Sequence, residues 1–237
     1  LWFGQGHTHD SEVHADHIAA DAADHAEFTM TDAHGEQVAV HLGIPGRHNV
    51  MNALAAATVA LRYGMPLTAI AQTLAAQHTI SPHRMALSTV SRQGASFELI
   101  DDSFNANPDS MKAGLDGLRA WNANDGRQPF RVALLGAMLE LGADERELHA
   151  SVGEYAAGLG LDAIITVGSP SDAHLNVLAE SLAEGATRGR AASVDCVQTI
   201  DEAERIVLDL AKNHTDTVVL LKGSHASGLS ALAERWA

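Results

Sequence analysis

The sequence predicts an α/β fold in which a mostly parallel sheet is flanked by helices. From residue 95 onward, short apolar runs alternate with amphipathic stretches of helical length. Three of the apolar runs end in polar loops that contain glycine, namely LLGAMLELG, TVGSPSD and LLKGSHASG. In a parallel sheet each strand leads into a crossover helix, so we expect these loops to lie at one edge and to form a site.

The first 84 residues predict a smaller, partial α/β domain. Residues 1–47 are rich in histidine and aspartate and contain strand-like pieces such as QVAVHLG at 37–43. Strong helix formers predict helices at 48–64 and 67–77, the first ended by Gly64. Ser81-Pro82 is typical of a linker, so we expect domains at 1–84 and 85–237.

The second domain is expected to contain six strands and five helices. The strands are predicted at 85–90, 95–100, 130–136, 163–168, 192–197 and 217–223, and the helices at 108–123, 144–159, 172–184, 200–213 and 226–236. Arg92-Gln93-Gly94 predicts a hairpin turn between the first two strands. Thr199 and Glu202 have the spacing of a capping box.

Composition narrows the class of protein. The net charge of −15 over 237 residues argues against nucleic acid or an anionic membrane as the main partner. Cys196 is the only cysteine, which favours a reducing, cytoplasmic location. No apolar run approaches the roughly 20 residues of a membrane span, and no signal peptide is evident, so we expect no membrane insertion.

The stretch IDDSFNANPDSM, at 100–111, places many polar side chains between a strand and a helix. Pro108 suits the first helical position, and Asn107 suits the cap before it. Four polar residues then lack a structural explanation: Asp101, Asp102, Ser103 and Asn105. A carboxylate beside hydroxyl and amide groups can bind ribose hydroxyls or an ammonium group, whereas the helix N-terminus favours an anion. A zwitterionic ligand would fit both.

Asn49 and Asn52 are three residues apart in the predicted helix 48–64, so both can lie on one face. Their amides can donate and accept hydrogen bonds, as recognition of a purine edge requires. Alternatively, Asn49 belongs to the helix cap and Asn52 is a satisfied core amide, and spacing alone favours this alternative.

Two basic residues are further candidates. Arg84 follows the linker and could bind phosphate through two hydrogen bonds, although a lone arginine is more often a surface charge. Lys222 ends a predicted strand and could pair with a ligand carboxylate, with Gly223 allowing close backbone approach.

The opening HTHDSEVHADH contains possible metal ligands, but their order fits no helical zinc pair. These residues are His7, His9, Asp10, His14, Asp16 and His17. We interpret the stretch as a solvated loop and assign no metal ligand in the chain. Glycine-rich phosphate-binding motifs are also missing.

Taken together and in chain order, GRHNVMNALAAA, SPHRM, IDDSFNANPDSM, LLGAMLELG, ELHASVGEYAA and LLKGS resemble the Mur ligase family. The resemblance implies the end of a central ATPase domain followed by a Rossmann-like C-terminal domain. It further implies that the phosphate-binding loop and most Mg²⁺ ligands lie upstream of Leu1. On this view the chain is a fragment that is inactive alone.

The resemblance also implies an activity, with DDSFNANPDSM as its most specific motif. The family member with this motif adds D-alanyl-D-alanine to UDP-N-acetylmuramoyl-tripeptide in peptidoglycan synthesis, using ATP and Mg²⁺. ATP converts the tripeptide carboxylate into an acyl phosphate, and the dipeptide amine then displaces phosphate. We expect a cytoplasmic monomer. The alternatives are another Mur-type or folylpolyglutamate-type amide ligase, or a non-catalytic nucleotide-binding module.

Matched to the family motifs, Asn49 and Asn52 would contact adenine, while Arg84 and Asp102 would hold the phosphate and ribose. The expected dipeptide-side residues are Ser103, Asn105, Asn107 and Lys222. No catalytic residue is assigned within the chain. At Ala137 the sequence departs from the aspartate usual in the family, which removes one carboxylate from the rim of the expected site.

Overall fold

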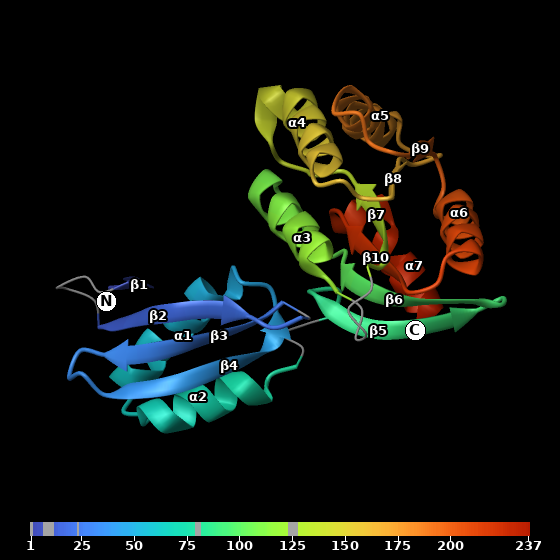
Figure 1. Ribbon diagram of the computed structural model, residues 1–237. Helices are drawn as coiled ribbons and strands as arrows, with labels where there is room; N and C mark the ends of the chain where they lie inside the picture. Colours follow the sequence, from blue (N-terminus) through green and yellow to red (C-terminus); the bar gives the residue numbers. More distant parts are fainter. Residues whose placement is uncertain (1, 7–11, 23, 79–81, 123–127) are drawn as a thin grey trace. The chain divides into compact units, whose positions relative to one another are not determined.

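The computed structural model describes residues 2–6, 12–22, 24–78, 82–122 and 128–237. The chain divides into two compact units, Leu1–Ile80 and Ser81–Ala237, each with its own sheet and core (Figure 1). Both units combine strands with helices, so the α/β fold class is confirmed.

Unit 1 is a four-stranded sheet covered on one face by two helices. Its elements are β1 (Phe3–Gln5), β2 (Val13–Ala20), β3 (His25–Asp32), β4 (Gln37–Pro45), α1 (Asn49–Arg62) and α2 (Leu67–Ala76), with strand order β1-β2-β3-β4. β1 is parallel to β2 and the other pairs are antiparallel. Phe28, Leu42 and Leu54 are buried in one core between sheet and helices.

The expectation of a solvated loop at the start of the chain is wrong for His14, Asp16 and His17, because all three lie on β2. Val13 and Ala15 are buried in the core, and pairing with β3 satisfies the backbone of this segment. These two effects outweigh the polar composition. His14 is only 6% exposed, and its Nε2 lies 3.2 Å from Asp16 Oδ2. His7, His9 and Asp10 are outside the described residues.

Unit 2 contains a six-stranded sheet of order β5-β6-β10-β7-β8-β9. The strands are β5 (Ala86–Arg92), β6 (Ala95–Asp102), β7 (Phe130–Gly136), β8 (Ala163–Val167), β9 (Val194–Val197) and β10 (Thr217–Lys222). All neighbours pair in parallel except β5, which forms the expected hairpin with β6. Its turn places Gln93 and Gly94 at φ of 50° and 83°.

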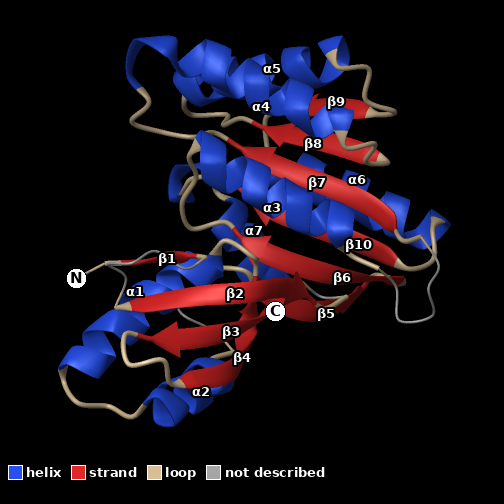
Figure 2. Cartoon of the chain, turned by 60° about the vertical axis from the view of Figure 1, so that its left-hand side comes forward, coloured by secondary structure: helices blue, strands red, loops and turns tan. Residues whose placement is uncertain are grey.

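Helices cover both faces of this sheet, which confirms the prediction of a sheet flanked by helices (Figure 2). The helices are α3 (Pro108–Ala120), α4 (Glu145–Gly158), α5 (Ala173–Arg188), α6 (Ile200–Asn213) and α7 (Leu229–Trp236), with 3-10 turns at Gly142–Asp144 and His225–Ser227. The predicted capping box is present before α6, since Thr199 Oγ1 accepts from Glu202 N at 3.1 Å and Glu202 Oε2 accepts from Thr199 N at 3.1 Å.

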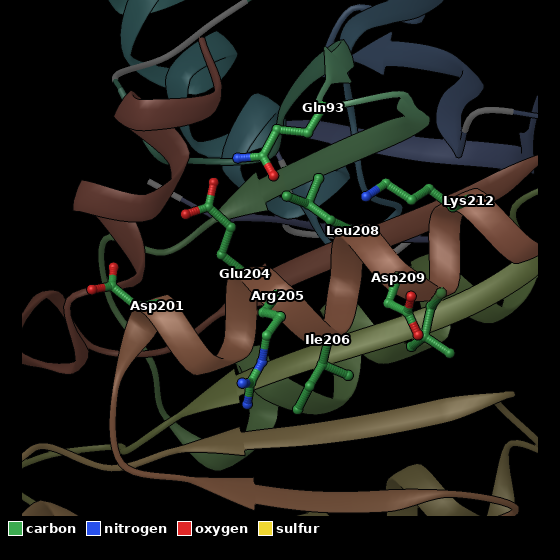
Figure 3. A pocket seen from close by; sticks show the side chains of 9 residues that line it. Gln93, Asp201, Glu204, Arg205, Ile206, Leu208, Asp209 and Lys212 are labelled. Carbon is green, nitrogen blue, oxygen red and sulfur yellow. The ribbon is translucent and has the colours of Figure 1, made fainter.

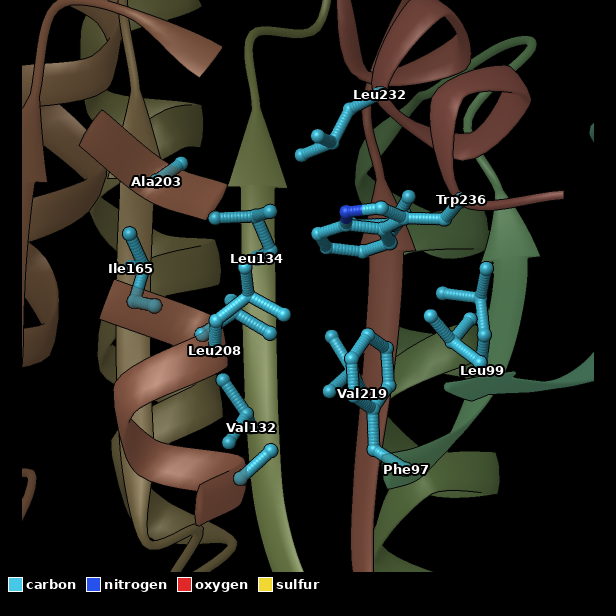
Figure 4. Packing of buried hydrophobic residues seen from close by; sticks show 14 of the residues in the cluster. Phe97, Leu99, Val132, Leu134, Ile165, Ala203, Leu208, Val219, Leu232 and Trp236 are labelled. Atoms are coloured by element: carbon cyan, nitrogen blue, oxygen red, sulfur yellow. The ribbon is translucent and has the colours of Figure 1, made fainter. Parts of the chain in front are cut away.

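Alternation along the buried strands divides the core into two layers. Val132 and Leu134 of β7 pack against α6 and α7, whereas Ala133 and Leu135 pack against α3, α4 and α5. In the first layer, Trp236 meets the edge of the Phe97 ring, with ring centres 5.1 Å apart (Figure 4). Both faces of the strands are therefore apolar, as a covered parallel sheet requires.

Helices α4 and α5 cross at a distance that excludes side chains at two positions. A Cβ atom at Gly153 of α4 would overlap the carbonyl oxygen of Leu182, and one at Gly185 of α5 would overlap that of Ala150. The close crossing therefore depends on glycine at both positions.

We predict that Gly153→Ala destabilises unit 2 by about 1–3 kcal/mol, because the added methyl group must push the two backbones apart. Gly158→Ala in the same helix is the matched control, since nothing lies within 4 Å of a Cβ there. That control should change stability by less than about 1 kcal/mol. Urea unfolding followed by tryptophan fluorescence measures both, and equal effects would contradict the close crossing.

Candidate functional site

The candidate site lies where the parallel strands of unit 2 end. The register of β6, β10, β7 and β8 places their carboxyl ends at one edge of the sheet, so the loops that follow them are neighbours as expected. Ser224 N donates to the carbonyl of Ala137 at 2.9 Å, which joins the loops after β10 and β7. A Cβ on Gly223 would lie 2.9 Å from Gly136 Cα, so glycine at this position lets the backbones of the two loops pass closely.

Asp101 organises the loop after β6 from a buried position. Its Oδ1 accepts two hydrogen bonds from Ser103, one from the side-chain Oγ at 2.6 Å and one from the backbone N–H at 3.2 Å. Its Oδ2 lies 2.8 Å from Nδ1 of His83. Ser103 is fully buried, so its hydroxyl shapes the loop and does not face solvent. His83 was not anticipated from the sequence.

The segment that carries Arg84 is held onto the same loop. Phe104 N donates to the carbonyl of His83 at 3.1 Å, and the guanidinium carbon of Arg84 lies 4.5 Å from the centre of the Phe104 ring. His83 and Met85 have φ of 61° and 51°, a conformation rare for residues with side chains. The stack leaves Arg84 and Phe104 exposed, with the guanidinium available to an anion.

The buried side chain of Lys222 holds this loop in place. The side chain is 2% exposed, and its ammonium group lies 2.8 Å from Asp102 Oδ2 and donates to the carbonyl of Asn105 at 2.7 Å. Its aliphatic stem passes over Gly114 of α3, where a Cβ would lie 3.3 Å from Lys222 Cδ. The ammonium is therefore engaged by protein oxygens, and Asp102 is oriented by it.

The two asparagines before α3 have different surroundings. Asn107 is the N-cap, since its Oδ1 accepts from Ser110 N at 2.8 Å, and Pro108 follows at the first helical position as predicted. The exposed Asn105 uses its Oδ1 to accept from Ala106 N at 2.8 Å. Asn105 thus keeps its amide N–H groups toward solvent, whereas the cap occupies the Asn107 oxygen.

The loop after β7 depends on a buried histidine. His149 Nδ1 donates to the carbonyl of Glu145 at 2.6 Å, so Nε2 accepts from Met138 N at 2.9 Å. This pattern requires the neutral ring, and burial lowers the pKa of His149 below 6.5. Ala137 is fully buried against Leu175 and Leu178, so this position is apolar and not a rim of the site.

Asn49 and Asn52, the remaining candidates, belong to unit 1. Asn49 is buried, and its Nδ2 donates to the carbonyl of Pro45 at 2.8 Å. Asn52 Nδ2 donates to Asn49 Oδ1 at 2.9 Å. Asn52 is exposed, which excludes the alternative that it is a core amide. Its amide oxygen and its second N–H can therefore contact a ligand.

A separate hollow of about 490 Å³ lies along α6 and contains none of these candidates. Figure 3 shows Gln93 opposite Glu204 and Leu208, while Arg205 and Ile206 point away on the other side of the helix. Glu204 Oε1 already accepts a hydrogen bond from Trp236 Nε1 at 3.0 Å.

Within the described part of the chain, no helix is long and apolar enough to cross a membrane.

We predict that Lys222→Met destabilises unit 2 by about 2–4 kcal/mol, because Asp102 loses its buried partner and the Asn105 carbonyl loses a donor. The methionine side chain keeps most of the volume beside Gly114, so the loss of stability measures the effect of removing the ammonium group. Lys212→Met, at an exposed position of α6, should change stability by less than about 0.5 kcal/mol. Urea unfolding compares the two, and equal stabilities would remove the supporting role of Lys222.

We also predict an acid-sensitive contribution from His149. Because the folded state lowers the pKa of His149, the unfolded chain takes up a proton first as the pH falls through 6.5. The contribution of His149 to the free energy of unfolding is complete above pH 6.5. It decreases as the pH falls below 6.5, by up to about 1.4 kcal/mol per pH unit. His149→Gln should flatten the dependence of unfolding free energy on pH in this range. An unchanged slope would contradict the assignment.

Residues 83–225 match the family model described as "Mur ligase, glutamate ligase domain". The UDP-N-acetylmuramoyl-tripeptide–D-alanyl-D-alanine ligase of Mycobacterium tuberculosis is 38% identical over 229 residues, which is 94% of this chain and 44% of that protein. The Escherichia coli enzyme of the same name is 37% identical over 147 residues, covering 62% of this chain and 30% of its own length. The chain therefore spans less than half of these relatives.

Among solved structures, a crystal structure of MurF from Acinetobacter baumannii superposes with a TM-score of 0.78 at 28% identity. It covers 98% of this chain, and the chain covers 46% of it. Sequence and fold agree, and the chain belongs to the Mur ligase family.

Proposed function

We propose that the protein carrying this chain joins D-alanyl-D-alanine to UDP-N-acetylmuramoyl-tripeptide in an ATP-dependent reaction of the cytoplasm. The observation that carries the proposal is the loop 101–107 of unit 2, which leads into the N-terminus of α3. The buried Lys222 holds Asp102 and Asn105 of this loop in place. The similarity to D-alanyl-D-alanine-adding ligases extends over 94% of the chain and supports the same reaction.

Each unit, taken by itself, offers groups that suit a part of ATP. In unit 2, the exposed guanidinium of Arg84 is fixed over Phe104 and suits a phosphate. Asp102 is held by Lys222 and suits ribose hydroxyls. In unit 1, the exposed amide of Asn52, supported by Asn49, suits a purine edge. When bound, ATP supplies the phosphoryl group that activates the tripeptide carboxylate.

On the dipeptide side, Asn105 offers exposed amide N–H groups, and the α3 N-terminus at Asn107 favours the dipeptide carboxylate. Ser103 and Lys222 are buried, so in this proposal they act by positioning the loop. The contribution of these residues is to orient the amine toward the activated carboxyl group and to stabilise charge around it.

Two further components are expected from parts of the ligase that this chain does not include. The chain covers 44% of its Mycobacterium tuberculosis relative, and the described residues contain no glycine-lysine phosphate loop. We propose that this loop and the Mg²⁺ ligands are contributed by the remainder of the protein. The chain alone should accordingly show no turnover.

The test uses the full-length protein. Phosphate release from ATP should require both UDP-N-acetylmuramoyl-tripeptide and D-alanyl-D-alanine, measured by a coupled phosphate assay. Asp102→Ala should lower kcat/KM by about 100-fold or more, because the nucleotide loses an oriented contact. Asp209→Ala, at an exposed position of α6 away from the loop 101–107, is the matched control and should stay within about threefold.

The acceptor distinguishes the alternatives. Turnover with diaminopimelate, lysine or glutamate in place of D-alanyl-D-alanine would show another amide ligase. Nucleotide binding by the full-length protein without turnover on any acceptor would show a non-catalytic binding module. Unchanged turnover in the Asp102→Ala variant would remove the assignment of the site.

A further inference from the structure

Three side chains with donor atoms of the kind that metals bind lie close together in unit 1, on the sheet face opposite to α1 and α2. Asp21 comes from the turn between β2 and β3, His25 begins β3, and His41 lies on β4. One donor atom from each residue lies within 4.8 Å of the donors of the other two. His41 points away from the core because its neighbours Val40 and Leu42 are buried under the helices.

Hydrogen bonds and strand pairing fix the backbone around this cluster. Asp21 N donates to the carbonyl of His25 at 3.0 Å, and His25 N donates back to Asp21 Oδ1 at 2.8 Å, which closes the turn and fixes the carboxylate. Glu27 of β3 pairs directly with His41 of β4, and the register shifts between His25 and Glu27. Strand pairing therefore brings His25 beside His41, although 16 positions separate them in the sequence.

We propose that Asp21, His25 and His41 form a binding site for a divalent ion of the zinc class. Two imidazoles and one carboxylate are a donor set that suits Zn²⁺. Two imidazoles on one tetrahedral zinc ion have ring centres about 5 Å apart, and neighbouring donor atoms about 3.3 Å apart. The ring centres of His25 and His41 are 5.8 Å apart and the three donor atoms lie within 4.8 Å of one another, so the side chains must move closer together to hold an ion.

A carboxylate also orients the His41 imidazole. His41 Nδ1 lies 3.0 Å from Glu27 Oε1. A carboxylate on one ring nitrogen fixes the ring and raises its basicity, which is the usual support of a zinc-bound histidine, so Glu27 is a positioning residue for His41. Asp21 Oδ2 and His25 Nδ1 are 3.0 Å apart and are both donors to the proposed ion, while Asp21 Oδ1 keeps its hydrogen bond from His25 N.

This site is independent of the proposed ligase reaction. Asn49 and Asn52 belong to α1, which packs on the other face of the sheet, and among the described residues their side chains bond to Pro45 and to each other, not to the cluster. Binding can therefore be measured directly on this chain, without any activity assay.

The experiment is isothermal titration calorimetry of the untagged chain with ZnCl₂, together with visible absorption after addition of Co²⁺. The wild-type chain should bind one Zn²⁺ with micromolar affinity and give the intense spectrum of tetrahedral Co²⁺. His25→Ala and His41→Ala should each weaken Zn²⁺ binding at least tenfold, and Glu27→Gln should weaken it by about 10-fold through orientation of His41.

His34→Ala is the matched control, because His34 is an exposed histidine in the turn after β3 and should leave the affinity unchanged. His7→Ala/His9→Ala should likewise have no effect. The proposal is overturned if the wild-type chain fails to bind Zn²⁺ stoichiometrically at micromolar concentration. It is also overturned if the His41→Ala variant binds Zn²⁺ as tightly as the wild-type chain, or if binding is lost in the His7→Ala/His9→Ala variant. Circular dichroism of each variant establishes that it is folded.

Discussion

The candidate site of unit 2 depends on the buried ion pair between Lys222 and Asp102. An ammonium group that is 2% exposed is costly to remove from water, and only close oxygen partners offset that cost. The partners are the Asp102 carboxylate at 2.8 Å and the Asn105 carbonyl at 2.7 Å, both in the loop after β6. The requirement to satisfy Lys222 therefore fixes the conformation of the loop, and with it the orientation of Asp102.

The rest of unit 2 is arranged so that this contact can form. Parallel pairing of β10 with β6 places Lys222 directly beside Asp102 in the register, and Gly114 leaves space on α3 for the lysine stem. His83 and Asp101 fix the preceding segment to the same loop, so Arg84 is presented next to Phe104. Rigid strands, small residues and buried charges together preorganise the exposed groups that a ligand would meet.

Unit 1 presents polar groups by a different principle. Its sheet buries one face and exposes the other, so alternation along β3 and β4 places polar residues together on the open face. Cross-strand pairing then joins Glu27 to His41 and brings His25 near them. On the covered face, the Asn49 amide anchors the start of α1 to Pro45 and orients Asn52. Strand register thus determines which polar groups meet.

The sequence by itself determined the parallel α/β fold of unit 2, the β5–β6 turn, the caps at Asn107 and Thr199, and the common edge of the polar loops. These features follow from local signals, because periodicity, glycine positions and capping residues act within a few residues of each other. Only the tertiary structure decided that Lys222 is buried, that His83 binds Asp101, and that His25 meets His41. These pairings join distant segments and depend on strand register, so no short stretch of sequence encodes them. The polar start of the chain predicts a loop for the same reason, because β2 exists through its pairing with β3.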